Sequence, residues 1–152
     1  MTISSFTDDN RFLSNFWLEP KRANKSVEHF YQAAKAAKPE EAAEILSGET
    51  TPGQAKRLGQ KVTLRADWDQ IKDDVMEQNV RSKFNLDEDL AAKLLATGDE
   101  ELIEGNTWDD KVWGAVLDEE TGEWEGENRL GKLLMRIRGE LQLRQAEGEA
   151  TS

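Results

Sequence analysis

A run of apolar side chains between positions 67 and 84 is the strongest structural signal in the chain. These side chains follow the i, i+3, i+4 rule, which places them in one stripe on a helix of about 3.6 residues per turn. The stripe consists of Trp68, Ile71, Val75, Met76, Val80 and Phe84, and Asp67 precedes it as an N-cap. A helix of this length must bury its stripe, so we expect a fold built on helix packing. Trp68, in the first turn, fits either the core or a surface that stacks on a ligand.

Five other stretches carry helix start and stop signals. They span residues 26–35, 39–46, 51–62, 87–97 and 128–145. Ser26, Thr51 and Asp87 are suitable N-caps, and Gly48 and Gly98 follow two of the stretches as stops. The sequence therefore predicts about six helices.

The remaining segments are short or irregular. Residues 12–20 are predicted as a short strand or extended segment, 101–117 as one or two short strands with a polar loop, and 118–127 as a hairpin tip. The polar end, 144–152, is expected to fray. We predict the α+β class, mainly helical with a few short strands, in a single compact domain over residues 1–144 followed by a polar tail over 145–152.

The composition excludes several classes of function. The chain has no cysteine, which excludes a disulfide framework, a thiolate nucleophile and a cysteine-ligated metal. Its one histidine, His29, is too few for a histidine-rich metal site and fits a structural role. A formal net charge of -11 argues against tight nonspecific binding to DNA or to an anionic membrane. No stretch is apolar enough for a membrane span, and the first residues lack a targeting pattern. We expect a cytoplasmic protein, or one of the host cytoplasm if its source is a virus, with no metal and no cofactor.

Three polar side chains share one side of the helix predicted at 26–35. Glu28, Gln32 and Lys35 recur at helical spacing, while Val27, Phe30, Tyr31 and Ala34 fall on the neighbouring side. Ser26 as N-cap puts Glu28 in the first turn, where the helix dipole favours its charged form. Two interpretations remain open: the polar stripe faces water as ordinary surface charge, or it lines a cleft.

A second polar group lies in the loop predicted between the short strands. It consists of Glu104, Asn106, Trp108, Asp110 and Trp113. Two carboxylates and indoles suit cleavage of a glycosidic or N-glycosidic bond, because a carboxylate stabilises an oxocarbenium-like transition state and an indole stacks on the leaving base. Residue spacing alone does not show that this group lies close to Glu28, Gln32 and Lys35 in the fold.

Three further features could contact a ligand. Asn15, flanked by apolar residues, needs either backbone or ligand partners if it is buried. Gly131, in the first turn of the last helix, invites a close approach to the backbone and would suit an anion or phosphate. Two basic groups are either ordinary charged helix faces or contacts for a phosphate-bearing ligand: Lys56, Arg57, Lys61 and Arg65, and then Arg129, Lys132, Arg136 and Arg138.

Six blocks in order carry a resemblance to a known family: FLSNFW, SVEHFYQAAKA, TPGQAKRLGQKV, LRADWDQIKDDVM, KLLATGDEELIEGNTWDDKVWG and ENRLGKLLMRIRGEL. The chain resembles the NADAR family, named for an association with NAD and ADP-ribose, over roughly Phe12 to Leu141. This family includes the YbiA-like N-glycosidases. The resemblance implies a compact, mostly helical fold. It also implies hydrolysis of an N-glycosidic bond, either in an aminopyrimidine ribose-phosphate intermediate of riboflavin synthesis or in ADP-ribose attached to guanine.

The matching blocks also imply roles for individual residues. Glu28, of the E-H-x-x-Q segment, would be the catalytic carboxylate, Asp110 a second one, and Lys35 would tune Glu28 or contact phosphate. The implied ligand-binding residues are Asn15, Phe16, Gln32, Trp68, Glu104, Trp108, Trp113, Gly114, Asn128, Arg129 and Gly131. This hypothesis requires Glu28 and Asp110 to act on one sugar carbon.

Two departures from the family pattern affect the substrate more than the reaction. The link from Pro20 to Ser26 is shorter than usual, and the acidic segment 118–127 places Glu127 where a lysine is common. We expect a small nucleotide-like substrate, or ADP-ribosylated nucleic acid, as the partner. A non-catalytic module that binds ADP-ribose or NAD is the main alternative, and a helical adaptor for a protein partner is a third.

Overall fold

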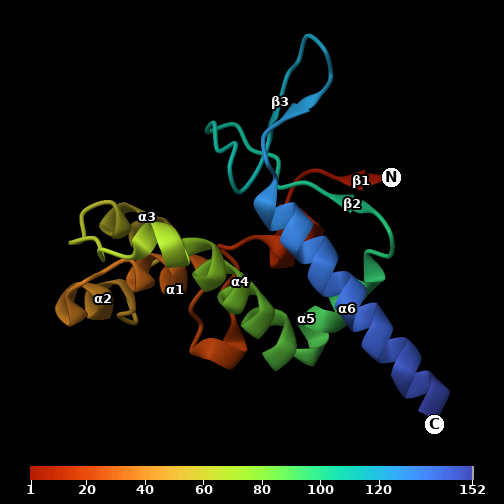
Figure 1. Ribbon diagram of the computed structural model, residues 1–152, viewed down its shortest axis with the longest axis horizontal. Coiled ribbons are helices and arrows are strands. Elements are labelled where there is room, and N and C mark those ends of the chain that lie inside the picture. The colour runs from red at the N-terminus through yellow and green to blue at the C-terminus, as the bar shows by residue number, and fades with distance from the viewer. Residues whose placement is uncertain (152) are drawn as a thin grey trace. The chain divides into compact units, whose positions relative to one another are not determined.

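The computed structural model describes residues 1–151 (Figure 1). Over this range the chain forms six α-helices, two short 3-10 helices and four strands of two residues each. It divides into two compact units. One unit is Asn15–Asp87, and the other combines Met1–Ser14 with the chain from Glu88 onward. The mainly helical α+β class predicted from the sequence is confirmed.

The Asn15–Asp87 unit is a cluster of helices around α1. Its elements are η2 (Pro20–Arg22), α1 (Val27–Ala34), α2 (Pro39–Ile45), α3 (Pro52–Gly59) and α4 (Trp68–Leu86). Helix α1 packs against α2, α3 and α4 (Figure 1). Ala33, Ile45 and Ala55, one from each of α1, α2 and α3, are buried together. Because three helices pack against α1, side chains on several of its sides are buried.

Local sequence sets where these helices begin. At α3, the Gln54 N–H donates to Thr51 Oγ1 at 3.1 Å, and the Thr51 N–H donates to Gln54 Oε1 at 2.9 Å, forming a capping box. Pro39 occupies the first turn of α2, as predicted. Asp67 precedes α4, but its carboxylate pairs with Arg65 and makes no capping hydrogen bond. The predicted starts of α2, α3 and α4 are therefore confirmed, although the expected capping bond from Asp67 is not formed.

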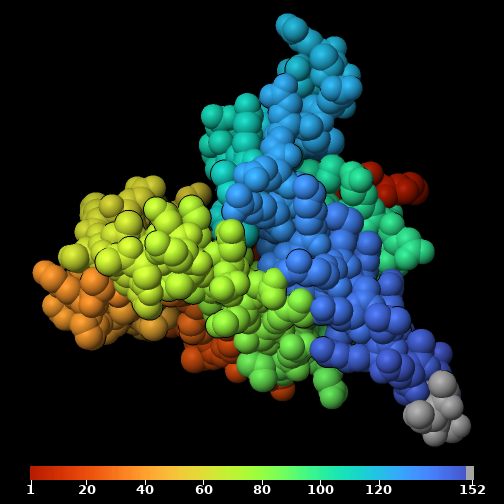
Figure 2. Space-filling view, in the orientation of Figure 1, coloured from red at the N-terminus to blue at the C-terminus, as the bar shows by residue number. Residues whose placement is uncertain are grey.

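The other unit is made of both ends of the chain. Its elements are β1 (Thr2–Ile3), η1 (Asp8–Leu13), α5 (Glu88–Ala96), β2 (Glu101–Leu102), β3 (Val116–Leu117), β4 (Trp124–Glu125) and α6 (Arg129–Thr151). Strand β1 pairs in parallel with β2, with Ile3 beside Leu102. Helix α6 packs against α5 and β2, and Leu130, Leu134 and Ile137 of α6 are buried. Strands β3 and β4 pair antiparallel as a hairpin, with β4 inside the segment 118–127 that was expected to be only a hairpin tip, and the segment from β3 to β4 projects as a narrow arm in Figure 2.

Two predictions of local structure are wrong. The strand or extended segment expected at 12–20 begins instead as the end of η1, where Phe12 and Leu13 are buried and the Ser14 N–H donates to the Arg11 carbonyl oxygen at 2.9 Å. The apolar side chains thus reach the core from a tight turn. Helix α6 runs to Thr151, past the end expected at Gln145. Glutamine, alanine and glutamate at 145–147 are good helix formers, which explains the continuation into the segment expected to fray.

No helix within residues 1–151 combines the length and apolar character that crossing a lipid bilayer requires.

Candidate active site

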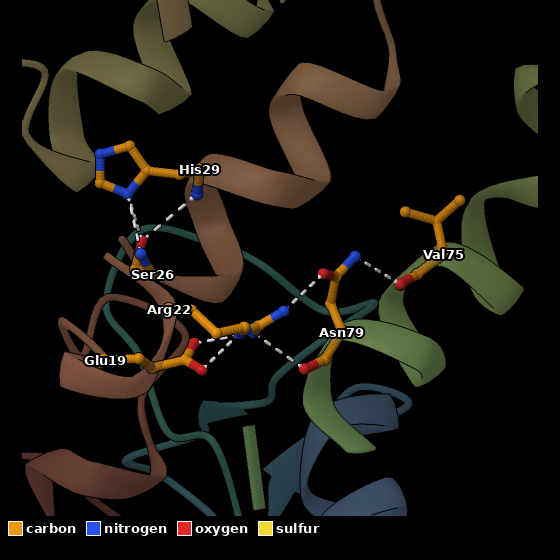
Figure 3. Close-up of polar contacts among 6 residues, drawn as sticks. All are labelled: Glu19, Arg22, Ser26, His29, Val75 and Asn79. Carbon is orange, nitrogen blue, oxygen red and sulfur yellow. Dashed lines mark hydrogen bonds and ion pairs between the residues drawn. The ribbon is translucent and has the colours of Figure 1, made fainter. Parts of the chain in front are cut away.

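The start of α1 is fixed by a network around Ser26. Ser26 Oγ accepts a hydrogen bond from the His29 N–H at 3.2 Å, and the Ser26 N–H donates to His29 Nδ1 at 3.0 Å (Figure 3). Because Nδ1 is the acceptor, Nε2 carries the hydrogen and donates it to the Thr50 carbonyl oxygen at 2.6 Å. His29 is fully buried, and burial lowers its pKa. These contacts agree with the predicted structural role of His29, and the cap places Glu28 in the first turn of α1.

Glu28 and Gln32 form a buried pair on one side of α1. They are 8% and 5% exposed, so the interpretation of Glu28 as an ordinary solvated surface charge is wrong. Gln32 Nε2 donates to Glu28 Oε1 at 2.7 Å, and the Glu28 N–H donates to the Asn15 carbonyl oxygen at 3.0 Å. The carboxylate and the backbone of Glu28 are therefore both held in place.

Lys35, the C-cap of α1, interacts electrostatically with Glu28. Burial lowers the pKa of Lys35, the charge of Glu28 opposes the change, and the charge of Lys56 adds to it. Its Nζ lies 5.7 Å from the centre of the Tyr31 ring. An amine in this environment gives up its proton more readily than an exposed lysine, and the catalytic roles of Glu28 and Lys35 stay predictions.

The other predicted ligand-binding residues of this unit differ in exposure. Trp68 is 6% exposed and packs edge-to-face on Tyr31, with the ring centres 5.1 Å apart, which favours the core interpretation. Asn15 is partly buried, and its Nδ2 lies 3.5 Å from Met76 Sδ. Phe16 is 44% exposed. Of the two aromatic residues, Phe16 has the greater area available to a ligand.

Asn106 organises the loop that carries the second group of predicted residues. Its side chain is buried, its Nδ2 donates to the Asp110 carbonyl oxygen at 2.9 Å, and its Oδ1 accepts from the Asp110 N–H at 3.0 Å. Nδ2 also contacts Glu104 Oε2 at 3.2 Å. A Cβ at Gly114 would collide with Glu104, so this glycine allows the loop to close. Asn106 thus links the Glu104 side chain to the Asp110 backbone within this loop, and the ligand-binding roles of these residues stay predictions.

The acid and the indoles of this loop have distinct surroundings. Asp110 Oδ1 accepts from the N–H groups of Val112 and Trp113, both at 3.0 Å, which closes a local turn. Trp108 is 60% exposed, whereas Trp113 is partly buried, with the Arg129 guanidinium 6.0 Å from its ring centre. Trp108 is therefore the indole of this loop with the larger surface for stacking.

Glu28 belongs to the Asn15–Asp87 unit and Asp110 to the other unit. Their joint action on one sugar carbon stays a prediction.

At the start of α6, protein groups occupy the places where a ligand was expected. Asn128 Oδ1 accepts from the Glu104 N–H at 2.9 Å, and its Nδ2 donates to the Leu102 carbonyl oxygen at 2.9 Å. A Cβ at Gly131 would collide with that same carbonyl oxygen. The close approach predicted at Gly131 is therefore made by β2. Arg129 Nη2 contacts Glu127 Oε1 at 3.1 Å, so a negative charge already faces this guanidinium. The ligand-binding roles of Asn128, Arg129 and Gly131 stay predictions.

Sequence reasoning missed a buried charge cluster in the Asn15–Asp87 unit. The Arg22 guanidinium donates to both carboxylate oxygens of Glu19, at 2.7 and 2.8 Å, and to Asn79 Oδ1 and its carbonyl oxygen, at 3.0 and 3.1 Å (Figure 3). Lys83 is 2% exposed, and burial lowers its pKa to about 7, against the opposing charge of Glu19. The signal was present, because Lys83 lies seven residues after Met76 and three after Val80, on the buried face of α4. This cluster ties the η2 loop, which leads into α1, to α4.

Among residues 1–151, no group of three or more His, Cys, Asp and Glu side chains is arranged to hold a metal ion.

Comparisons with known proteins agree with the resemblance noted in the sequence. The profile of the NADAR domain matches residues 4–142. N-glycosidase Npun_R5314 of Nostoc punctiforme is 40% identical over 76% of this chain and 73% of its own length. N-glycosidase YbiA of Escherichia coli is 35% identical over 90% of this chain and 85% of its own length.

A riboflavin biosynthesis protein of Vibrio vulnificus, VVA0006, is 40% identical over 77% of this chain, which corresponds to 30% of that longer protein. The solved NMR structure of Escherichia coli YbiA superposes with a TM-score of 0.74 and 33% identity, covering 97% of this chain and 90% of that one. The relatives' names indicate N-glycosidase function in this family, and the structural neighbour has the same mainly helical fold.

Proposed function

Because the chain belongs to the NADAR domain family, we propose that it hydrolyses the N-glycosidic bond of a phosphorylated riboside. The observation that carries this proposal is the buried Glu28 carboxylate, held by Gln32 and coupled electrostatically to Lys35. A carboxylate kept out of bulk water stabilises a developing positive charge more strongly than an exposed one. That is the charge that forms on the ribose when its bond to nitrogen breaks.

In the proposed reaction the bond between the anomeric carbon and the base nitrogen breaks, and the electron pair leaves with the base. Glu28 stabilises the oxocarbenium-like transition state and accepts a proton from the attacking water. Lys35, whose pKa burial lowers, tunes Glu28 or contacts a phosphate. The water oxygen becomes the new anomeric hydroxyl, and the proton that Glu28 has taken up passes to the released base, which returns Glu28 to its carboxylate form. In this scheme the exposed ring of Phe16, in the same unit as Glu28, supplies stacking area for the base, and Asp110 and Trp108 keep the roles predicted for them from the sequence.

Two substrate classes fit this chemistry. One is an aminopyrimidine ribose-phosphate intermediate of riboflavin synthesis, which the name of the Vibrio vulnificus relative favours. The other is ADP-ribose attached to a guanine base, free or in nucleic acid. Incubation of each class with the enzyme, followed by chromatography and mass spectrometry of the released base, distinguishes them. Binding of ADP-ribose in calorimetry with no release of base or ribose would instead indicate a non-catalytic binding module.

The substitution Glu28→Gln tests the reaction directly. It preserves the side-chain volume and removes the charge, so we expect turnover to fall by about 100-fold or more while the protein stays folded. Glu40→Gln, on the exposed surface of α2, is the matched control and should leave turnover unchanged. Turnover of Glu28→Gln close to that of the unmodified protein would remove Glu28 from the mechanism.

We further propose that the reaction needs no metal, because side chains supply the charge and the proton transfer. Treatment with EDTA should leave the rate unchanged. A rate that falls with EDTA and returns with a divalent cation would contradict this part of the proposal. The cytoplasm, or the host cytoplasm for a viral source, is the proposed location.

A further inference from the structure

A glycine of α3 leaves room for the side chain that holds Glu28. Gly59 lies at the end of α3, against α1. A Cβ placed on Gly59 would collide with Gln32 Oε1 and would lie only 2.6 Å from Gln32 Cδ and 3.0 Å from its Cβ. Even a methyl group at position 59 would therefore displace the Gln32 side chain.

The backbone conformation of Gly59 does not explain the glycine. This residue lies within the helical range of α3 and is absent from the positive φ region, so alanine would fit the backbone. Alanine is also the better helix former. The requirement for glycine comes from the space that Gln32 fills.

The orientation of the Gln32 amide follows from the two groups on either side of it. Its NH₂ group faces Glu28 Oε1 at 2.7 Å, which directs Oε1 toward Gly59. The opposite orientation would place two oxygens against each other. Over residues 1–151, Gln32 Oε1 is buried and accepts no hydrogen bond, so this amide is held through its NH₂ group, which donates to Glu28. An amide held only on its NH₂ side depends on tight packing for its position.

We propose that Gly59 is a positioning residue that acts through Gln32 on Glu28. Gly59 leaves the space that the Gln32 amide fills beside α3, and the amide then donates to the Glu28 carboxylate and favours its ionised form. The effect on catalysis rests on the proposed function. The contacts from Gly59 through Gln32 to Glu28 do not depend on it.

The direct test follows the titration of the Glu28 carboxyl carbon by NMR, with the signal assigned by its loss in Glu28→Gln. In Gly59→Ala and in Gln32→Met we expect the midpoint to move upward by about one pH unit or more, because a hydrogen bond to the charged form is lost. Gly53→Ala is the matched control in the same helix, since its Cβ would meet only Arg57 Nη1, at 3.8 Å. Its midpoint should equal that of the unmodified protein. An unchanged midpoint in folded Gly59→Ala would overturn the inference.

A double-mutant cycle gives an independent answer. In a Gln32→Ala background the space beside position 59 is empty, so Gly59→Ala should no longer shift the Glu28 titration. An equal shift in both backgrounds would show that Gly59 acts by another route and would overturn the inference.

Activity measurements separate this inference from the proposed function. If the enzyme hydrolyses a candidate riboside, Gly59→Ala should lower kcat about tenfold or more and move the acidic limb of the pH profile upward, while Gly53→Ala does neither. If no riboside is hydrolysed, the proposed function fails and the NMR titration still decides the positioning role. Hydrolysis by Gly59→Ala with an unmoved pH profile would refute the positioning role alone.

Discussion

Replacing Arg22 tests whether the buried charge cluster stabilises the Asn15–Asp87 unit. The Arg22 side chain is 13% exposed and that of Glu19 is 2% exposed, so both lie largely outside the solvent. The guanidinium makes four hydrogen bonds, two to Glu19 and two to Asn79, and lies 4.3 Å from the centre of the Phe30 ring. Arg22→Ala removes all of these contacts and leaves the Glu19 carboxylate buried.

The expected magnitude follows from this geometry. Removing one partner of a buried ion pair costs about 3–5 kcal/mol in the free energy of unfolding. Lys83 stays near Glu19 and offsets part of the unpaired charge, so we expect a loss near the lower end, about 3 kcal/mol. Arg22→Lys keeps the charge but loses the planar fork that reaches both Glu19 and Asn79, and we expect a smaller loss of about 1–2 kcal/mol.

Urea unfolding at pH 7 measures both losses. Arg65→Ala is the matched control, because Arg65 contacts both oxygens of Asp67 at 3.0 Å in a similar geometry but on the exposed surface. Solvent screens that pair, so its removal should change stability little. The reasoning is refuted if Arg22→Ala is as mild as Arg65→Ala, or if Arg22→Lys destabilises as much as Arg22→Ala.

Three further predictions test other parts of the molecule. The pKa of Lys83 is about 7 in the folded protein against an ordinary value of 10.5, so the unfolded chain binds more protons between these values and the free energy of unfolding rises with pH in that window. Lys83→Met should remove this rise and stabilise the protein most below pH 7. Urea unfolding at pH 6, 7.5 and 9 measures this, and a free energy of unfolding that changes with pH in the same way in both proteins would contradict it. Gly131→Ala should lower the free energy of unfolding by about 1–3 kcal/mol because its Cβ meets the Leu102 carbonyl oxygen, whereas Gly139→Ala in the same helix, with no atom within 4 Å, should not. Trp108→Ala should weaken binding of a base-containing ligand in calorimetry without lowering the urea midpoint, since this ring is 60% exposed; equal affinity would remove Trp108 from the ligand-binding residues.

The helices could be predicted because their signals are local. The cap at Ser26, the capping box of Thr51 and Gln54, and the proline at position 39 each act within one turn, so they are visible in the sequence. The pairing of β1 with β2 has no such signal. Two-residue strands about 100 positions apart carry too little pattern to identify each other, and the turn that buries Phe12 has the same apolar composition as a strand.

The polar side of α1 shows which part of the candidate site cannot be predicted from the sequence. Helical spacing correctly put Glu28 and Gln32 on one side, but the space that Gln32 fills depends on Gly59, a residue of a different helix. At Gly131 and Asn128 the residue types suggested a ligand, and protein groups already make the close contacts there. The residue types were informative in both places, whereas the identity of the neighbour depended on tertiary structure.

The division of the chain has a consequence for its synthesis. The Asn15–Asp87 unit is continuous, so all of its residues leave the ribosome before any residue of α5 does. The first residues, by contrast, have no partner for β1 until residues 101 and 102 emerge. We therefore expect vectorial folding in which the helical cluster that holds Glu28 forms first and the N-terminal segment waits for the C-terminal half, so that ribosome-stalled chains ending near position 120 should already resist proteolysis within 15–87.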